Sequence, residues 1–302
     1  MNKPQIALGI DLGGSKIEII AIDATGNELI RRRVATPQGD YHATLAAIGG
    51  LVSAVENELG AQGTIGIGTP GALSLITGRI KNSNSTCLND QPLKHDLEVL
   101  LRREVQIAND ANCFALSEAV DGAAAGAKIV FGVILGTGVG SGIVINRQVL
   151  TGANAIAGEW GHNPLPLPQS CDLPLPPCYC GRVGCVETYL SGPGVARDHL
   201  TATGEMLDPP TIFARANEND KQCQATAQRY EERLARALAQ VINILDPDVI
   251  VLGGGMSNIG RIYDNVPRLW VRYVFSDQVA TKLARNLHGD SSGVRGAAWL
   301  WR

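Results

Sequence analysis

A cluster of soft metal ligands lies between residues 162 and 185. His162 is followed by Cys178, Cys180 and Cys185 in the pattern Cys-x-Cys-Gly-x-x-Gly-Cys. Three thiolates and one imidazole supply the four ligands of a tetrahedral structural zinc site. The sequence therefore predicts one structural Zn²⁺, bound by His162, Cys178, Cys180 and Cys185.

Other interpretations of these cysteines stay open. A disulfide is disfavoured because the chain has seven cysteines, an odd number, and no secretory features. Unrelated buried thiols would not need glycines at this spacing. Cys171 could replace His162 as the fourth ligand, because it lies between His162 and Cys178 in the sequence. We favour His162 because it follows Glu159 and Gly161 in one turn, whereas Cys171 lies in a proline-rich loop.

Three glycine-rich segments each follow an expected strand. They are Asp11-Leu12-Gly13-Gly14-Ser15-Lys16, Gly136-Thr137-Gly138-Val139-Gly140-Ser141-Gly142 and Gly253-Gly254-Gly255. Glycine lets backbone N–H groups approach phosphate oxygens closely, and Ser15 and Lys16 add a hydroxyl donor and a cation. Asp11 is suited to hold Mg²⁺ directly or through water. Each segment alone is also typical of an ordinary hairpin, but the three together favour a phosphate site.

Asn109 and Asp110 lie between an expected strand and an expected helix. A carboxylate at such a junction can accept a proton from a substrate hydroxyl. The alternative is a helix N-cap, a position that both Asn and Asp favour. The neighbouring glycine loops favour the catalytic interpretation.

The order of these motifs resembles the ROK family of sugar kinases and repressors. The resemblance rests on Asp11 to Lys16, Thr69-Pro70-Gly71, Asn109-Asp110, Leu135 to Gly140, Gly158-Glu159-x-Gly161-His162, and the cysteine motif with Glu187. It covers essentially the whole chain and is closest to bacterial fructokinases of the mannofructokinase type. Two residues depart from the family pattern: Ser15 stands where threonine is usual, and Cys87 where relatives often have tryptophan.

The resemblance implies an α/β fold with two ribonuclease-H-like domains of the actin and hexokinase type around a cleft. We expect the N-terminal domain to span residues 1–120 and to be joined by the C-terminal helix 291–302. The C-terminal domain would span residues 121–290 and carry the zinc loop. The family habit also implies a homodimer.

The resemblance also implies ATP and Mg²⁺ as cofactors, with Asp110 as the catalytic base. The implied nucleotide-binding residues are Gly9, Asp11, Leu12, Gly13, Gly14, Ser15, Lys16, Gly136, Thr137, Gly138, Val139, Gly140, Ser141, Gly142, Gly254 and Gly255. The implied sugar-binding residues are Gly71, Asn84, Asn109, Asp110, Glu159, His162 and Glu187. We expect an ATP-dependent kinase acting on the 6-hydroxyl of D-fructose. The alternatives are N-acetylglucosamine, glucose or mannose as the sugar.

Hydrophobic patterns predict the elements that position these residues. We expect strands at 5–11, 17–22, 28–35, 64–68, 105–108, 129–135, 139–145 and 249–252, and helices at 41–59, 92–103, 111–122, 224–245 and 293–301. A strand, a glycine turn and a second strand occur both at the N-terminus and at 129–145. This repeat indicates an internal duplication, with a boundary near residue 120.

Charge and hydropathy limit the partners. The chain has 26 basic and 29 acidic residues, a net charge of −3, which disfavours nonspecific nucleic-acid binding. No apolar run approaches the ~20 residues of a membrane-spanning helix. Only five residues precede Ile6, too few for the DNA-binding segment of a repressor. We therefore expect a cytoplasmic enzyme with no nucleic-acid or membrane partner.

Overall fold

The computed structural model describes residues 6–301; the short segment before the first strand lies outside the described residues. The chain divides into two compact units. The first comprises Met1–Gly126, Gly142–Ala157 and Asp290–Arg302, and the second comprises Ala127–Ser141 and Gly158–Gly289. The expected domain limits stay a prediction.

The first unit contains, in chain order, β1 (Ala7–Leu12), β2 (Lys16–Ile22), β3 (Glu28–Ala35), α1 (Tyr41–Leu59), β4 (Thr64–Thr69), β5 (Ala72–Leu73), β6 (Ile80–Lys81), η1 (Thr86–Leu88), α2 (Leu93–Leu101), β7 (Gln106–Asn109), α3 (Asp110–Val120), β10 (Gln148–Val149), α9 (Ser292–Ala298) and η6 (Trp299–Trp301). Strand β9 (Val139–Ile145) and the 3₁₀ turn η5 (Gly289–Ser291) contain residues of both units.

The second unit contains β8 (Ile129–Leu135), η2 (Trp160–His162), η3 (Ser170–Asp172), α4 (Val186–Leu190), α5 (Gly192–Thr203), α6 (Pro209–Asn217), α7 (Lys221–Leu245), β11 (Val249–Gly253), η4 (Gly255–Asn258), α8 (Arg261–Trp270) and β12 (Lys282–Arg285). Each η element is a short 3₁₀ helix. Within residues 6–301, no helix is both long enough and apolar enough to cross a membrane.

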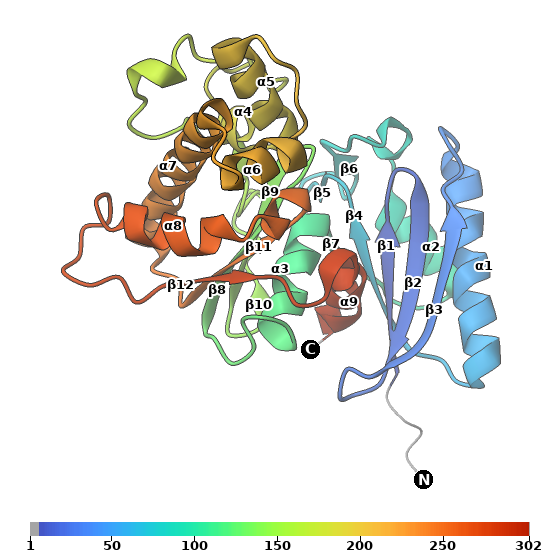
Figure 1. Ribbon diagram of the computed structural model, residues 1–302. Helices are drawn as coiled ribbons and strands as arrows, with labels where there is room; N and C mark the ends of the chain where they lie inside the picture. The colour runs from blue at the N-terminus through green and yellow to red at the C-terminus, as the bar shows by residue number, and fades with distance from the viewer. Residues whose placement is uncertain (1–5, 302) are drawn as a thin grey trace. The chain divides into compact units, whose positions relative to one another are not determined.

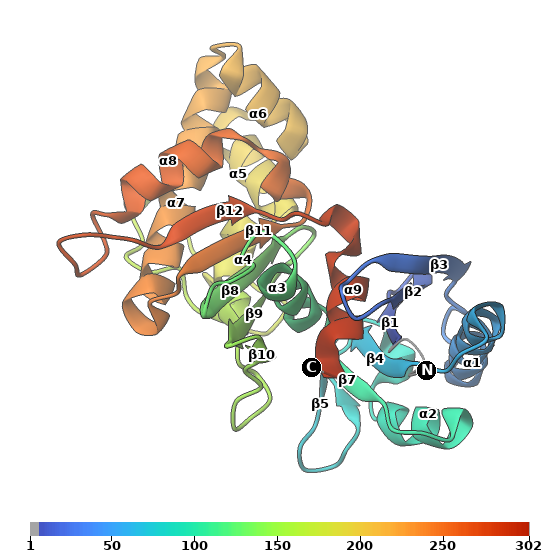
Figure 2. The same ribbon diagram turned by 90° about the horizontal axis from the view of Figure 1, so that it is seen from below.

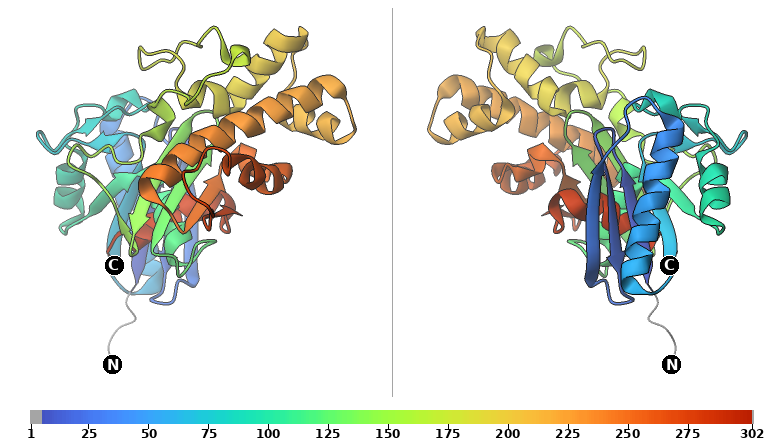
Figure 3. Two further views of the ribbon diagram at one scale, coloured as in Figure 1. Left: turned by 90° about the vertical axis from the view of Figure 1, so that its left-hand side faces the viewer. Right: turned by 90° about the vertical axis from the view of Figure 1, so that its right-hand side faces the viewer.

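The first unit is built on a mixed five-stranded sheet in the order β3-β2-β1-β4-β7 (Figure 1). β1, β2 and β3 pair antiparallel, as the expected hairpins require, and β4 and β7 continue the sheet in parallel. The side chains of Leu8, Ile10 and Ile67 are fully buried in a core shared with α1 and α2. The same arrangement of α1 beside β2 and β3 is visible in Figure 3.

Helix α9 packs against the sheet of the first unit so closely that two strand residues must be glycine (Figure 2). A Cβ atom on Gly9 would lie 2.0 Å from the Val294 carbonyl oxygen, and one on Gly66 would lie 1.8 Å from the Ala297 carbonyl oxygen. Gly9 was expected among the nucleotide-binding residues. The structure gives it a packing role in the middle of β1, and its nucleotide contact stays a prediction.

The second five-stranded sheet has the order β10-β9-β8-β11-β12, with β8, β11 and β12 parallel. Numbered along the chain, the strands of both sheets follow the same order: third, second, first, fourth, fifth. This shared topology confirms the predicted internal duplication. The long helix α7 packs against α4, α5, α6 and α8 (Figure 3).

Candidate functional site

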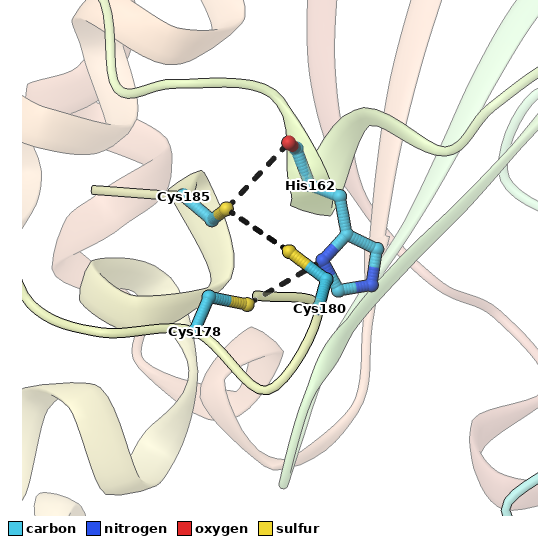
Figure 4. A group of neighbouring side chains, drawn as sticks. All are labelled: His162, Cys178, Cys180 and Cys185. Atoms are coloured by element: carbon cyan, nitrogen blue, oxygen red, sulfur yellow. Dashed lines mark hydrogen bonds between the residues drawn. The ribbon is translucent and has the colours of Figure 1, made fainter. Parts of the chain in front are cut away.

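Four metal-binding side chains converge where the sequence predicts a zinc site: His162, Cys178, Cys180 and Cys185 (Figure 4). Their ligand atoms all lie within 4.8 Å of one another. Cys180 Sγ is 3.7 Å from Cys185 Sγ, and Cys178 Sγ is 3.6 Å from His162 Nδ1. Zinc bonds of ~2.3 Å to sulfur and ~2.0 Å to nitrogen, arranged as a tetrahedron, separate such pairs by ~3.5–3.8 Å. The four donors therefore fit one structural Zn²⁺.

A tight turn places the cysteines of this metal centre. The Cys178 N–H donates to the Arg182 carbonyl at 2.8 Å, and the Gly181 N–H donates to the Cys178 carbonyl at 3.0 Å. An isolated bridge between Pro164 and Cys185 then brings the third thiol beside the segment that follows His162. Backbone hydrogen bonds thus hold the ligand geometry. Gly181 (φ 85°) and Gly184 (φ 69°) lie in the left-handed region of the backbone, which favours glycine.

Cys171, the alternative fourth ligand, is exposed and does not belong to this four-residue cluster. Its neighbour Asp172 is buried and accepts hydrogen bonds from Arg233 Nε at 2.7 Å and Arg236 Nη2 at 2.8 Å. Burial opposes the charge of Asp172, but the Gln169 N–H and the two guanidinium groups outweigh it and lower the pKa of this carboxyl. The Cys171 segment is therefore anchored to α7, and the geometry favours His162 as the fourth ligand.

The two ring nitrogens of His162 face different partners. Nδ1 faces Cys178, whereas Nε2 lies 3.0 Å from the hydroxyl of Tyr179. The Tyr179 ring meets the imidazole edge-on and is 83% exposed. Sequence reasoning missed Tyr179, because nothing in the Cys-x-Cys pattern singles out its middle residue. A sugar contact by His162 stays a prediction.

The predicted catalytic residue, Asp110, is the first residue of α3, and Asn109 is the N-cap. Asn109 Oδ1 accepts from the Ala111 N–H at 2.9 Å, and its Nδ2 donates to the Gly71 carbonyl at 3.0 Å. The N-cap interpretation is therefore confirmed for Asn109. Asp110 is left exposed at a helix N-terminus, where the helix dipole stabilises a carboxylate.

Asp11, at the end of β1, shares its surroundings with Asp110. Burial raises the pKa of Asp11 to about 6, the negative charges of Asp110 and Glu18 add to this effect, and Lys16 opposes it. Two mutually repelling carboxylates with oxygen donors form a suitable pair for a hard divalent cation. The residues present therefore fit the Mg²⁺ that the family resemblance implies.

The β6–η1 loop presents Asn84 in the same unit as Gly71 and Asp110. Asn89 Oδ1 accepts from the Ser83 N–H, and its Nδ2 donates to the Ser83 carbonyl, both at 2.8 Å. This pair of bonds fixes the loop while the Asn84 side chain stays exposed. No hydrogen bond to that side chain occurs among residues 6–301, so its amide is available to a ligand.

The turn between β1 and β2 is closed by the Gly13 N–H, which donates to the Lys16 carbonyl at 3.0 Å. Gln38 Nε2 donates to the Gly14 carbonyl at 2.6 Å. Ser15 and Lys16 are exposed, as a phosphate contact requires, whereas the side chain of Leu12 is buried in the core. Only the backbone of Leu12 could therefore reach a nucleotide.

The second expected loop is shorter than its glycine content suggests. Gly136 donates its N–H to the Gly138 carbonyl at 3.0 Å and forms the turn, but Val139–Gly142 belong to strand β9. The Val139 side chain is buried, and Ser141 Oγ donates to the Gly158 carbonyl at 2.5 Å. We call residues 136–138 the nucleotide turn, after the prediction that nucleotide phosphates bind there.

A pocket of about 980 Å³ opens beside the nucleotide turn in the second unit. Gly136, Thr137 and Gly255 line it, while Gly254 is not among its lining residues. Its walls are largely apolar and include Pro193, Ala196, Met206, Pro209, Phe213, Met256 and Ile259. A pocket of this size with apolar walls and a glycine turn suits a nucleotide base with its phosphates.

The structure thus groups the predicted residues by unit. The first unit holds Asp11, Gly71, Asn84, Asn109 and Asp110. The second unit holds the metal centre, the nucleotide turn and pocket, and the two predicted sugar ligands Glu159 and Glu187. Glu159 is the N-cap of η2, and Glu187 lies in the first turn of α4.

The family model described as the ROK family matches residues 7–302. The N-acetyl-D-glucosamine kinase of Salmonella gallinarum is 40% identical over 296 residues, covering 97% of this chain and 98% of that protein. The ROK hexokinase of Thermus thermophilus has a TM-score of 0.86 at 30% identity, covering 98% of this chain and 97% of that one. A ROK glucokinase from Streptomyces griseus, solved with glucose and AMPPNP, has a TM-score of 0.75 at 26% identity and covers 97% of this chain and 98% of that one.

These relatives confirm the expected α/β fold class, but they do not support the expected likeness to fructokinases. The relatives at 40% identity are N-acetyl-D-glucosamine kinases. The motifs named above belong to shared machinery, whereas specificity depends on a few contacts that motifs do not record. By the match over residues 7–302 and the relatives that span its length, the chain belongs to the ROK family and is a sugar kinase of that family.

Proposed function

We propose that the protein is an ATP-dependent N-acetylglucosamine kinase that phosphorylates the primary 6-hydroxyl of the sugar. The observation that carries the proposal is the 40% identity to N-acetyl-D-glucosamine kinases over 97% of the chain. N-Acetylglucosamine takes the place of D-fructose, which was expected from the overall likeness to mannofructokinases. The exposed Asp110 at the start of α3 supports the chemistry.

Asp110 acts as the general base. It accepts the proton of the sugar hydroxyl, and the resulting oxygen nucleophile attacks the γ-phosphorus of ATP as ADP leaves. The N-terminus of α3 stabilises Asp110 as a carboxylate before that proton arrives. Asp11 would hold Mg²⁺, which neutralises charge on the phosphates when bound.

Each unit carries proposed sugar ligands. Asn84 offers an unused side-chain amide, and Asn109 fixes the Gly71 backbone beside Asp110. Glu159, His162 and Glu187 are the proposed ligands from the second unit. Glu187 uses Oε2 to bind the Val139 N–H at 2.9 Å, and within residues 6–301 its Oε1 has no hydrogen-bond donor, so that oxygen can accept from a sugar hydroxyl.

The nucleotide occupies the apolar pocket, with its phosphates at the nucleotide turn. Gly136 and Thr137 present backbone to this pocket, and α5 begins beside it at Gly192. The Gly192 N–H donates to the Gly136 carbonyl and the Gly194 N–H to Ser191 Oγ, so α5 would favour an anionic group through its dipole. Zinc has a structural role, because all four of its positions are filled by protein ligands.

The proposal is tested by ADP release in a coupled assay with N-acetylglucosamine, glucose, mannose and fructose under identical conditions. We expect N-acetylglucosamine to give the highest kcat/KM, by about tenfold or more, because a site that pairs a polar group rejects sugars lacking it. The identity of the phosphorylated product is read by NMR. A lead by fructose or glucose would overturn the choice of sugar but keep the kinase, and no ADP release with any sugar would overturn the kinase.

A further inference from the structure

Glu187 connects the metal centre to the nucleotide turn. It lies two residues after the metal ligand Cys185, which is the N-cap of α4. Its Oε2 accepts a hydrogen bond from the Val139 N–H at 2.9 Å, immediately after the turn. A carboxylate that accepts from a backbone N–H makes a charge-assisted bond, which is stronger than a neutral one.

A side chain at position 138 would push the same carboxylate aside. A Cβ atom on Gly138 would lie 2.6 Å from Glu187 Oε2 and 3.6 Å from Glu187 Cδ. In the described part of the chain, no other atom comes within 4 Å of that Cβ position. The space at Gly138 is therefore restricted by Glu187 alone.

The nucleotide turn is held at its other end as well. The Gly192 N–H, at the start of α5, donates to the Gly136 carbonyl at 2.8 Å. Gly136 and Thr137 line the pocket between these two attachments. Because the attachments are few, displacing the one at Glu187 would move backbone that faces the nucleotide.

We propose that Glu187 is a positioning residue that fixes the nucleotide turn and so raises nucleotide affinity. The inference rests on the proposed function in one respect, that nucleotide phosphates bind at this turn. It adds a second role to the predicted contact of Glu187 with sugar: Oε2 holds the turn, while Oε1 has no hydrogen-bond donor within residues 6–301.

The test is a double-mutant cycle of Gly138→Ala with Glu187→Ala, read by calorimetric ADP binding in the presence of Mg²⁺ and the absence of sugar. With Glu187 present, we expect Gly138→Ala to weaken ADP binding about tenfold, because the new methyl displaces the carboxylate. In the Glu187→Ala background the new methyl group has no carboxylate to displace. We therefore expect Gly138→Ala to change ADP affinity less than about twofold further. Glu187→Gln keeps the side-chain volume, and Gly138→Ala should again weaken binding in that background.

Gly136→Ala is the matched control. A Cβ atom at Gly136 meets nothing within 4 Å, so any effect of this variant on ADP binding should be the same with and without Glu187. Metal content and melting temperature verify that each variant is folded and contains zinc. Sugar binding is measured separately. If Glu187 contacted only the sugar, its loss would change sugar affinity, and the effects of the two substitutions on ADP affinity would simply add.

An ADP cycle in which Gly138→Ala has the same effect in both backgrounds, or no effect in either, overturns the inference while leaving the kinase proposal intact. A wild-type protein that binds no ADP overturns both. Coupling confined to the Gly138–Glu187 pair supports the inference.

Discussion

The side chain of Asn109 joins the start of helix α3 to the backbone of Gly71. Its Nδ2 donates to the Gly71 carbonyl at 3.0 Å, and its Oδ1 accepts from the Ala111 N–H at 2.9 Å. One residue therefore caps the helix that begins with Asp110 and ties that helix to the neighbouring loop. Both polar ends of Asn109 are occupied, which favours a positioning role over a direct sugar contact.

Two substitutions separate these tasks. Asn109→Ser keeps a cap acceptor but loses the donor to Gly71, whereas Asn109→Ala loses both. We expect Asn109→Ala to lower the free energy of unfolding by about 1 kcal/mol and Asn109→Ser to lower it by less. Urea denaturation measures the difference. Equal losses in the two variants would mean that the cap contributes nothing measurable to stability.

Asp110→Asn should leave the fold and ADP binding nearly intact while lowering kcat by at least ~10²–10⁴-fold, the usual effect of losing a general base. Asparagine cannot accept the proton of the sugar hydroxyl, but it preserves the shape of the side chain. Single-turnover kinetics and ADP calorimetry together give the two quantities.

Asp40→Asn is the matched control for the Asp110 variant. Asp40 is the N-cap of α1 in the same unit, and its side chain accepts from the Ala43 N–H at 2.9 Å. Asparagine caps helices about as well as aspartate, so turnover should stay near the wild-type value. Normal turnover of Asp110→Asn would show that Asp110 is not the general base.

The sequence predicted the first unit well because its signals are local. Strands β1, β2 and β3 are short apolar or alternating runs separated by glycine turns, and α1 has apolar residues at helical spacing up to Gly60. In the second unit, α4, α5, α6 and α8 and strand β12 were not predicted. Pro193 lies in the first turn of α5, and Pro267 lies inside α8. Proline is tolerated at a helix start but removes a hydrogen bond elsewhere, so these helices depend on packing against α7.

The candidate site likewise has residues that the sequence predicts and contacts that it does not. The ligands of the metal centre were predictable because their types and short spacing determine the chemistry. The Tyr179 hydroxyl at His162 and the Glu187 carboxylate at Val139 were not, since those contacts form only when separate segments pack together. Sugar preference depends on contacts of this second kind, so the motifs do not determine which sugar is preferred.

The stability of the protein in magnesium-free buffer should depend on the charge of Asp11. Its folded-state pKa is raised from 3.8 to about 6, so the folded protein binds this proton more tightly than the unfolded chain does. The resulting stabilisation is fully present below pH ~4 and is lost as the pH rises through about 6. At pH 7 the charged carboxylate opposes folding, and Asp11→Asn removes that cost.

We therefore expect Asp11→Asn to be more stable than the wild type at pH 7, by on the order of 1–2 kcal/mol after allowing for partial exposure. The difference should shrink below pH 4, where both side chains are neutral. Melting temperatures across pH 3.5–8, with about 0.1 M salt throughout, test this. Adding Mg²⁺ with ADP should reverse the order at pH 7, since only the wild type offers a carboxylate to the cation. A pH-independent difference would show that charge is not the cause.

Cys180→Ala should remove the structural zinc and lower the stability of the second unit. Cys180 Sγ lies 3.7 Å from Cys185 Sγ in the four-residue cluster, so its loss leaves three donors. Metal-binding energy is also folding energy, because the assembled site does not exist in the unfolded chain. We expect purified wild-type protein to contain close to one equivalent of zinc, and Cys180→Ala to contain far less and to melt roughly 5–10 °C lower.

Cys171→Ala is the control for the zinc prediction, because it also removes one exposed thiol from the same loop region. Its thiol lies outside the cluster, and Asp172 would still anchor the segment to Arg233 and Arg236. We therefore expect this variant to keep its zinc and its melting temperature. Elemental analysis by mass spectrometry and thermal denaturation are measured on both variants and on His162→Ala. Retention of zinc by His162→Ala together with its loss from Cys171→Ala would show that Cys171, rather than His162, supplies the fourth ligand.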